Sequence, residues 1–323
     1  MEIFKYTKPL SLMAKSKRFG AVSVVLLLIS LGLILFKGFN FGVDFAGGTL
    51  IQIKYEGAAP ISKIREAISV DKAYEGAGVT RFGSDDEIVI KTKFSSQVLG
   101  DDVGKKMHML LKETGKFEVR RVDMIGAKVG SELREKGLTA MILAIIGILA
   151  YVSFRFEWRF AIASVLALLH DVTIAMGMIV LFNVEVNLDI LAALLTILGY
   201  SLNDTIIVFD RIREGIRTMK TSDLSTVIDE SVTRTLSRTT LTSLTTFFVV
   251  LTLFVFGGEI IHGFAFTLLV GVLVGTYSSI FVASPLLMWL GFSISDYRLK
   301  EAEKLKRQKE KEKMRAMYEQ GML

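Results

Sequence analysis

The sequence predicts a polytopic α-helical membrane protein with six transmembrane helices and one small α+β domain outside the membrane. Three observations lead to this fold class. The 323 residues are 51% hydrophobic and only 22% charged, and the mean hydropathy is +0.47. The apolar residues gather in six long stretches, and one polar block, residues 37–137, separates the first stretch from the second. A soluble domain or a disordered chain would not have this composition.

The first apolar stretch, residues 19–36, carries no charge and follows Lys15, Lys17 and Arg18. About 20 apolar residues cross the hydrocarbon core of a bilayer. No small-x-small cleavage site follows the stretch, so we expect an uncleaved membrane helix rather than a signal peptide. The sequence predicts the other five spans at Leu138–Phe154, Phe160–Phe182, Asn187–Phe209, Thr239–Phe256 and Gly263–Gly291. Pro285 is expected to end or kink the last span.

Lysine and arginine in the short connections predict the orientation of the spans. The connections on one side, with residues 1–18 and the tail 293–323, contain 22 of these residues. The opposite short loops, Asn183–Val186 and Gly257–His262, contain none. We therefore expect both termini in the cytoplasm and the block 37–137 outside. The basic balance of +6 is a topology signal and does not indicate nucleic acid.

The outer block is expected to alternate strands and helices in the order β-α-β-β-α-β. Alternating or β-rich residues predict strands at Thr49–Tyr55, Val79–Phe82, Glu87–Thr92 and Phe117–Met124. Helices are predicted at Pro60–Val70, where Ile61, Ile64 and Ile68 share one face, and at Ser96–Thr114. This order is that of the split β-α-β, ferredoxin-like domains. A polar helix, Ser131–Gly137, then leads into the second span.

Several classes of chemistry are excluded or disfavoured. The chain has no cysteine, which excludes disulfides, thiolate catalysis and Cys-ligated metals. Its three histidines lie far apart in sequence, so we expect no metal site. No glycine-lysine phosphate loop is present, so direct ATP use is not expected. We therefore expect no cofactor.

Asp204, in the fourth span, is the first candidate for a functional residue. It lies six residues before Asp210, about 9 Å from the inner end of the span. A charge inside a bilayer costs at least about 2.5 kcal/mol, so such a residue usually meets a partner or a water-filled cavity. Arg238 opens the fifth span at the inner edge and could reach towards Asp204. A carboxylate that moves between such a cation and apolar surroundings can carry a proton. The alternative is a permanently protonated or paired Asp204 whose hydrogen bond between helices fixes their packing.

His170, Asp171 and Asn203 are further polar residues at membrane depth. For them two interpretations stay open. They relay protons, or they form hydrogen bonds that fix the packing of the helices. Gly271 and Gly275 in the last span have the small-xxx-small spacing that indicates a helix contact.

The segment Gly42–Gly48 connects the first span to the outer domain. Its glycines permit positive φ and close approach of the backbone. We therefore interpret Gly42, Asp44, Gly47 and Gly48 as a domain hinge.

Two polar segments are assigned to the cytoplasmic side. Residues 211–238 predict an amphipathic helix lying on the membrane surface, with a cap at Ser222 or Asp223. The tail 293–323 interleaves Lys and Arg with Glu, which predicts a solvated helix near anionic lipid.

Long motifs at several places in the chain carry a resemblance to a known family. They are GVDFAGG at Gly42–Gly48, IGAKVGSEL at Ile125–Leu133, His170-Asp171, LGYSLNDTIIVFDRIRE at Leu198–Glu214, and TRTLSRTT at Thr233–Thr240. From residue 15 to about 295 the chain resembles the SecD/SecF family of protein-export membrane subunits. Six spans and a small outer domain match the SecF type. SecD shares the glycine motif but has a much larger outer region.

The resemblance implies a set of partners and a function in protein translocation, and a subunit of this kind is not an enzyme. A SecF-type subunit pairs with SecD in a twelve-span unit similar to the resistance-nodulation-division transporters. It works with the Sec channel (SecY, SecE and SecG) in the cell inner membrane, and YajC and YidC are further candidate partners. The proton-motive force then helps to move preproteins, with H⁺ as the coupling ion and Na⁺ as the alternative. The family's membrane aspartate and arginine correspond to Asp204 and Arg238, which implies proton coupling through this pair.

Two other functions remain open at this stage. One is a proton-coupled half-transporter that exports a small molecule or a lipid. It requires a substrate pocket among the spans or in the outer domain. The other is a passive scaffold of the Sec channel without ion coupling.

Overall fold

A computed structural model describes residues 9–93 and 103–319 of the chain. Within these residues, six helical segments are long and apolar enough to cross a membrane. The first four are α1 (Ser16–Phe36, preceded by η1, Met13–Lys15), α6 (Ala127–Arg155), α7 (Trp158–Leu181) and α8 (Leu188–Thr218). The last two are α9 (Leu224–Phe256) and α10 (Gly258–Ser278), which continues through η3 (Ser279–Ala283) and α11 (Ser284–Trp289). The prediction of six spans is confirmed.

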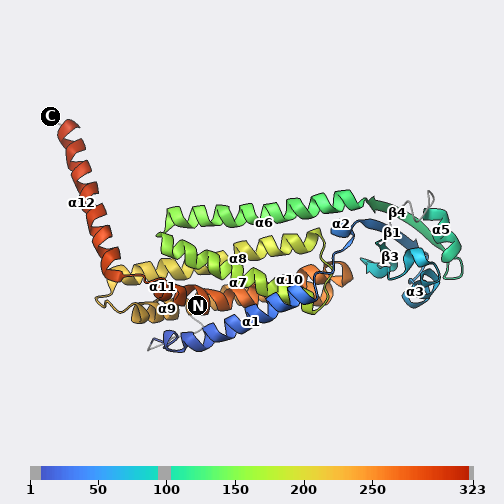
Figure 1. Ribbon diagram of the computed structural model, residues 1–323, viewed down its shortest axis with the longest axis horizontal. Coiled ribbons are helices and arrows are strands. Elements are labelled where there is room, and N and C mark those ends of the chain that lie inside the picture. The colour runs from blue at the N-terminus through green and yellow to red at the C-terminus, as the bar shows by residue number, and fades with distance from the viewer. Residues whose placement is uncertain (1–8, 94–102, 320–323) are drawn as a thin grey trace.

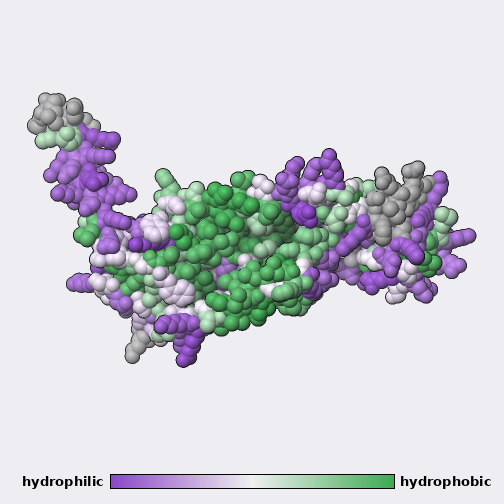
Figure 2. Space-filling view, in the orientation of Figure 1, coloured by the Kyte–Doolittle hydropathy of each residue, from purple (hydrophilic) through white to green (hydrophobic). Residues whose placement is uncertain are grey.

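These helices run side by side in an elongated bundle (Figure 1). The outer domain lies at one end, and α12 (Ile294–Glu319) projects from the other. On the face shown in Figure 2, apolar side chains form a broad surface over the middle of the bundle, and hydrophilic residues dominate both ends. This distribution is the one expected for a protein surrounded by lipid at mid-length and by water at the ends.

The outer domain is built on four antiparallel strands: β1 (Gly48–Tyr55), β2 (Gly78–Phe82), β3 (Ser84–Thr92) and β4 (Phe117–Ile125). Their order across the sheet is β2-β3-β1-β4, so β3 lies between β1 and β2. The helices α3 (Ile61–Ser69) and α5 (Val103–Leu110) occupy the predicted places in the chain, and a short turn of helix, η2 (Lys72–Tyr74), follows α3. The first part of the predicted helix Ser96–Thr114 lies outside the described residues, as do residues 1–8 and 320–323.

The outer domain buries the apolar faces that its sequence pattern predicts. Ile51 and Ile53 of β1 are fully buried, and Ile64 of α3 packs in the same cluster. Met107 of α5 completes it from the second helix. Strand alternation and helical spacing therefore direct these side chains to one core.

The polar segment 211–238 does not form a separate surface helix, contrary to the prediction. Its first part extends α8 to Thr218, and α9 begins at Leu224 and runs on through the span. The predicted cap is present, since the Asp223 side chain accepts hydrogen bonds from the backbone N–H groups at 225 and 226. Its apolar face (Val227, Ile228 and Val232) is fully buried against the other helices. The segment is thus divided between α8 and α9, and its buried face packs on protein instead of lying on the membrane surface.

Two other span boundaries also differ from the prediction. The polar helix predicted at Ser131–Gly137 is part of α6, which begins at Ala127. Near the end of the last span, the five residues of η3 form a π-helix immediately before Pro285. Proline has no N–H to donate to the preceding turn, and π-helical turns often occur where the regular hydrogen-bond ladder is interrupted.

Candidate functional site

Asp204 is fully buried in the middle of the bundle. Its Oδ2 accepts a hydrogen bond of 3.2 Å from Ser243 Oγ on the neighbouring helix α9. Its Oδ1 is buried and has no hydrogen-bond partner among the described residues, and the same holds for the hydroxyls of Tyr200, Thr205 and Thr239. Tyr200 lies one turn from Asp204 along α8, and Thr239 lies one turn from Ser243 along α9. Unpaired buried oxygens are costly, so this α8–α9 seam is suited to bind protons, water or a small cation.

Arg238 does not pair with Asp204, contrary to the approach suggested by the sequence. Arg238 is exposed. The Asp204 oxygens do not contact it, since Oδ2 accepts from Ser243 and Oδ1 has no partner among the described residues. The reason is the phase of α9. Thr239 and Ser243 face inwards, and Arg238 precedes Thr239 by one residue, which is about 100° around the helix. Asn203 is likewise exposed, one residue before Asp204.

Asp171 forms a second buried carboxylate site, between α7, α8 and α10. Its side chain is fully buried. Ser201 and Ser278 donate hydrogen bonds to Oδ2 at 2.5 and 2.7 Å. His170 Nδ1 is hydrogen-bonded with Oδ1 at 2.8 Å. Every carboxylate oxygen therefore has a partner, in contrast to Asp204.

Three consecutive residues of α10 connect these groups. Thr276 donates to Ser243 Oγ at 2.8 Å, and Ser243 in turn donates to Asp204. Tyr277 stacks on the His170 ring with 6.3 Å between the ring centroids, and its hydroxyl donates to the Phe19 carbonyl on α1 at 2.8 Å. Ser278 donates to Asp171. The two carboxylates are thus linked through one turn of α10, immediately before the π-helix.

Gly271 and Gly275 allow α10 to pack closely on α8, as their spacing predicts. A Cβ on Gly271 would lie 2.2 Å from Ile197 Cγ1, and one on Gly275 would lie 3.0 Å from Ser201 Cβ. Ile197 and Ser201 are themselves one turn apart on α8. The small residues therefore hold α10 close to α8, and Ser201 of α8 and Ser278 of α10 donate to the same oxygen of Asp171.

The glycine motif joins the outer domain to the start of α8. Asp44, in the short helix α2 (Val43–Ala46), accepts a hydrogen bond of 3.0 Å from the backbone N–H of Leu188, the first residue of α8. A Cβ on Gly42 would lie 1.8 Å from Asn187 Oδ1, and one on Gly47, where φ is 78°, would lie 2.8 Å from Ala127 Cα. The motif is therefore a tightly packed junction, and its movement as a hinge stays a prediction.

An ion pair strengthens the same junction. Lys91 Nζ on β3 lies 3.3 Å from Glu185 Oε2 in the loop before α8. The backbone N–H of Gly42 also donates to the Val186 carbonyl in that loop at 3.0 Å. The outer domain thus holds the outer end of the helix that carries Asp204.

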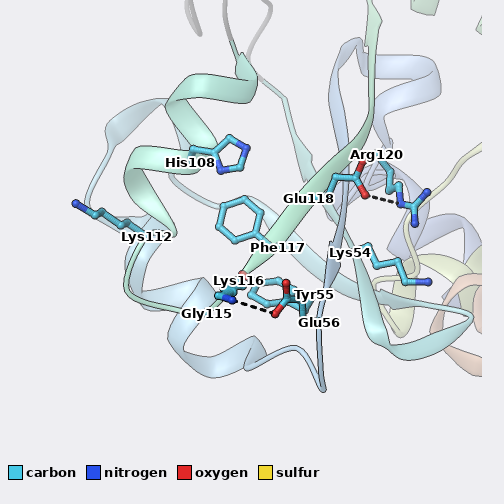
Figure 3. A pocket seen from close by; sticks show the side chains of 10 residues that line it. All are labelled: Lys54, Tyr55, Glu56, His108, Lys112, Gly115, Lys116, Phe117, Glu118 and Arg120. Atoms are coloured by element: carbon cyan, nitrogen blue, oxygen red, sulfur yellow. Dashed lines mark ion pairs between the residues drawn. The ribbon is translucent and has the colours of Figure 1, made fainter.

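The far side of the outer domain contains an open groove of about 590 Å³ (Figure 3). His108 of α5 stacks on Phe117 of β4, with 4.8 Å between the ring centroids. Charged pairs line the rim, with Lys116 Nζ 3.7 Å from Glu56 Oε2 and an Arg120–Glu118 pair at 3.4 Å. The groove is wide, polar and open, unlike the mostly apolar, enclosed pockets that bind small molecules.

The sequence reasoning selected Asp204, His170 and Asp171, and the structure buries all three. It missed Thr276, Tyr277 and Ser278, which connect them. The signal in the sequence was that these three polar residues are consecutive in an otherwise apolar span. Because hydroxyl side chains bond readily to carbonyls of their own helix, that run alone did not indicate a contact between helices.

Two family models match the chain. The model for the SecD/SecF GG motif matches residues 32–59, which include the glycine junction. The model described as protein export membrane protein SecD/SecF, C-terminal, matches residues 106–293, more than half of the chain. The chain belongs to the SecD/SecF family. Asp171, Asp204 and the α10 residues that join them all lie in the second SecD/SecF match.

Relatives named protein translocase subunit SecF match most or all of the chain. Protein translocase subunit SecF of Helicobacter pylori is 49% identical over 323 residues, which is 100% of both chains. That of Calditerrivibrio nitroreducens is 45% identical over 291 residues, 88% of this chain and 95% of its own.

A solved structure gives the same fold. The crystal structure of SecDF, a translocon-associated membrane protein from Thermus thermophilus, superposes with a TM-score of 0.78 and 34% sequence identity. The match covers 90% of this chain and 40% of the SecDF chain. This chain therefore corresponds to less than half of the SecDF molecule.

Proposed function

We propose that this chain is the SecF subunit of a protein translocase, pairs with SecD, and couples an ion gradient to preprotein movement. The observation that carries the proposal is the pair of buried carboxylates, Asp171 and Asp204, linked through α10. One of them, Asp204, has an unpaired oxygen in the α8–α9 seam. The other subunits named below, the orientation and the coupling ion are parts of the same proposal.

The coupling begins at Asp204. In its charged form the carboxylate accepts the hydrogen bond from Ser243, and Ser243 accepts one from Thr276. Protonation from the outer side removes the charge and weakens this charge-assisted contact. The change alters the preferred packing of α8 against α9 and α10. Na⁺ could bind the same oxygens in place of H⁺, because hydroxyl and carboxylate oxygens are suitable ligands for a small hard cation.

The movement reaches the outer domain through α8. Asp204 and Ser201 lie on this helix, and its first residue, Leu188, is bonded to Asp44 of the glycine junction. A shift of α8 therefore pulls directly on the outer domain, which acts on the translocating preprotein. One proton crossing 100 mV releases about 2.3 kcal/mol, which biases a two-state equilibrium without driving it to completion.

Exposed polar residues of α8 and α9 support a SecD contact on this surface. Arg238 and Asn203 point away from the helix bundle, and the α9 face that carries Arg238 also exposes Thr242 and Thr245. Polar side chains at membrane depth rarely face lipid. A SecD helix packed on this surface of α8 and α9 would cover them and offer Arg238 an acidic partner.

The remaining partners and the location follow from the family. The proposed complex includes the channel subunits SecY, SecE and SecG, with YajC and YidC as further candidates. It resides in the inner membrane, with both termini in the cytoplasm. This orientation places the outer domain where a preprotein emerges.

Ion flux in vesicles tests the proposal. The chain is reconstituted with SecD, a H⁺ or Na⁺ gradient is imposed, and internal pH or Na⁺ is followed. We expect Asp204→Asn to reduce the flux of the coupling ion at least tenfold. The matched control is Asp210→Asn, the same substitution at an exposed position of α8, which should leave the flux unchanged.

Each result separates the candidate functions. Normal flux in Asp204→Asn would refute ion coupling through this carboxylate and favour a passive scaffold. Flux that depends on a small molecule, without stimulation of preprotein translocation, would favour a half-transporter. Capture of SecD with the chain from membranes separates the translocase from that transporter.

A further inference from the structure

A cationic cavity lies at the end of the bundle opposite the outer domain. Its volume is about 240 Å³, and it is formed by the turn between α6 and α7, by α8 and by α12. Five cations line it: Arg155, Arg213, Arg217, Lys300 and Lys304. The carboxylates that line it are Glu157 and Glu301, so positive charge is in clear excess.

Arg213 is held rigidly in this cavity. Its guanidinium lies over the Phe156 ring, 4.9 Å from the centroid. Its Nη1 donates to the Arg155 carbonyl and its Nε to the Tyr297 hydroxyl, both at 3.3 Å. The Arg213 side chain is 17% exposed. An arginine fixed in this way loses little further freedom when it binds an anion.

The carboxylates at the cavity already have partners. Glu301 pairs with Arg217 at 2.5 Å, and Glu157 lies 3.9 Å from Lys300. Lys304 forms no ion pair with any residue in the described ranges. The contacts of Asp210 with Arg155 and Arg213 are long, 3.8 and 3.9 Å. Arg213 and Lys304 therefore remain available to an incoming anion.

The cavity lies beside large exposed apolar side chains. Phe154 lines it and is 97% exposed, and Trp158, at the start of α7, is 55% exposed. Both residues end or begin a membrane-spanning helix. Figure 2 shows that, at the end of the bundle next to α12, hydrophilic residues replace the apolar surface. Such a position combines an anion site with a surface for hydrocarbon chains.

We propose that this cavity binds the phosphate headgroup of an anionic phospholipid. The phosphate is expected to meet Arg213 and Lys304, and the acyl chains are expected to lie along Phe154 and Trp158. Cationic pockets between membrane helices at the water boundary recognise lipid headgroups in this way. The site connects α8, the helix of Asp204, to α12, but lipid binding does not depend on ion coupling.

Lipid binding by the full chain tests the proposal. The detergent-solubilised protein is titrated with phosphatidylglycerol, and bound lipid is counted by native mass spectrometry. Phosphatidylcholine is the zwitterionic reference, and inorganic phosphate is the probe for a free anion. We expect phosphatidylglycerol to bind at least tenfold more tightly than phosphatidylcholine.

Two variants locate the site. Lys304→Gln should weaken phosphatidylglycerol binding about fivefold, since one cation near the membrane surface is lost. Arg213→Gln should weaken it more, because the fixed guanidinium is lost. Lys309→Gln, an exposed lysine of α12 outside the cavity, is the matched control and should leave binding unchanged.

Three outcomes would overturn the proposal. Equal binding of the two lipids would show that charge is not recognised. An equal loss in Lys309→Gln and Lys304→Gln would indicate diffuse attraction by the tail rather than a site. Inorganic phosphate that displaces the lipid completely at micromolar concentration would identify a site for a free anion.

Discussion

The outer domain and the helix bundle distribute polar and apolar residues in opposite ways. In the outer domain Ile51 and Ile53 are fully buried, and its charged residues lie on the surface. In the bundle Asp171 and Asp204 are fully buried, and Phe36 and Phe154 are 94% and 97% exposed. The outer domain thus has an apolar interior, whereas the interior of the helix bundle also contains carboxylates.

The difference follows from the solvent around each region. Water drives apolar side chains of the outer domain into one core. Lipid gives no comparable gain for burying a leucine, so helices associate through close packing and hydrogen bonds between them. The bundle can therefore place carboxylates and hydroxyls inside, which ion coupling requires. The following experiments test this contrast, from the largest expected effect to the smallest.

Substitution of one isoleucine by alanine in each region should change the free energy of unfolding by very different amounts. Ile53→Ala removes a fully buried side chain of β1 and should destabilise the outer domain by about 2–5 kcal/mol. The matched variant Ile29→Ala removes a side chain of α1 that is 54% exposed and should cost well under that amount. Hydrogen–deuterium exchange of the full chain in detergent measures both. Equal destabilisation by the two variants would contradict the proposed difference between the outer domain and the helix bundle.

Tyr74 should make the outer domain sensitive to alkali. Burial, followed by the nearby charge of Asp71, raises the pKa of Tyr74 to about 12. A phenol with a raised pKa favours the folded state below pH 10, and that contribution is lost as pH rises from about 10 to about 12. The loss amounts to about 3 kcal/mol, at about 1.4 kcal/mol per pKa unit.

Tyr74→Phe tests this sensitivity directly. The Tyr74 hydroxyl is buried without a hydrogen-bond partner among the described residues, so its removal should not destabilise the domain at pH 7. The variant should then retain more stability at pH 11 than the parent protein. Exchange rates of β1 amides at the two pH values, corrected for intrinsic exchange, measure the effect. A parallel loss in both proteins would exclude Tyr74 as the cause.

A methyl group added at the α8–α10 contact should disrupt the bundle. The new Cβ in Gly271→Ala would lie 2.2 Å from Ile197 Cγ1, and overpacking of this kind costs about 1–3 kcal/mol. Gly57→Ala in the outer domain is the control, since no heavy atom lies within 4 Å of its added Cβ. Thermal unfolding in detergent, followed by size-exclusion chromatography, compares the two variants. A melting temperature for Gly271→Ala equal to that of Gly57→Ala would mean that α10 can move away freely.

The smallest effect is expected at the water-exposed cap of α9. A hydrogen bond from the Thr226 side chain, followed by one from the Thr226 backbone, lowers the pKa of Asp223. A depressed pKa adds stability above the ordinary aspartate value of about 3.9, and this stability is lost as pH falls below it. Asp223→Ala should therefore cost about 0.5–1 kcal/mol at pH 7 and less at pH 3. Exchange of the amides at 225 and 226 is the measurement, and a cost independent of pH would contradict the charge-based cap.

The sequence alone predicted most of the fold because its signals are local. Apolar stretches gave the six spans, and alternation in Thr49–Tyr55 with helical spacing in Ile61, Ile64 and Ile68 gave the elements of the outer domain. The predictions from sequence are wrong where contacts between helices determine the structure. Residues 211–238 are polar enough to suggest a separate helix, but residues 211–218 extend α8, and residues 224–238, with Val227 and Ile228 buried, begin α9.

For the candidate site, the sequence by itself determined which side chains are costly at membrane depth: His170, Asp171, Asp204 and Arg238. Only the tertiary structure decided which of them meet. The phase of α9 turns Arg238 outwards and Ser243 towards Asp204. The packing of α7, α8 and α10 together places Ser201 and Ser278 on one oxygen of Asp171. The cost of burying a charge is a property of one residue and its depth. The choice of partner depends on how several helices are rotated and packed together.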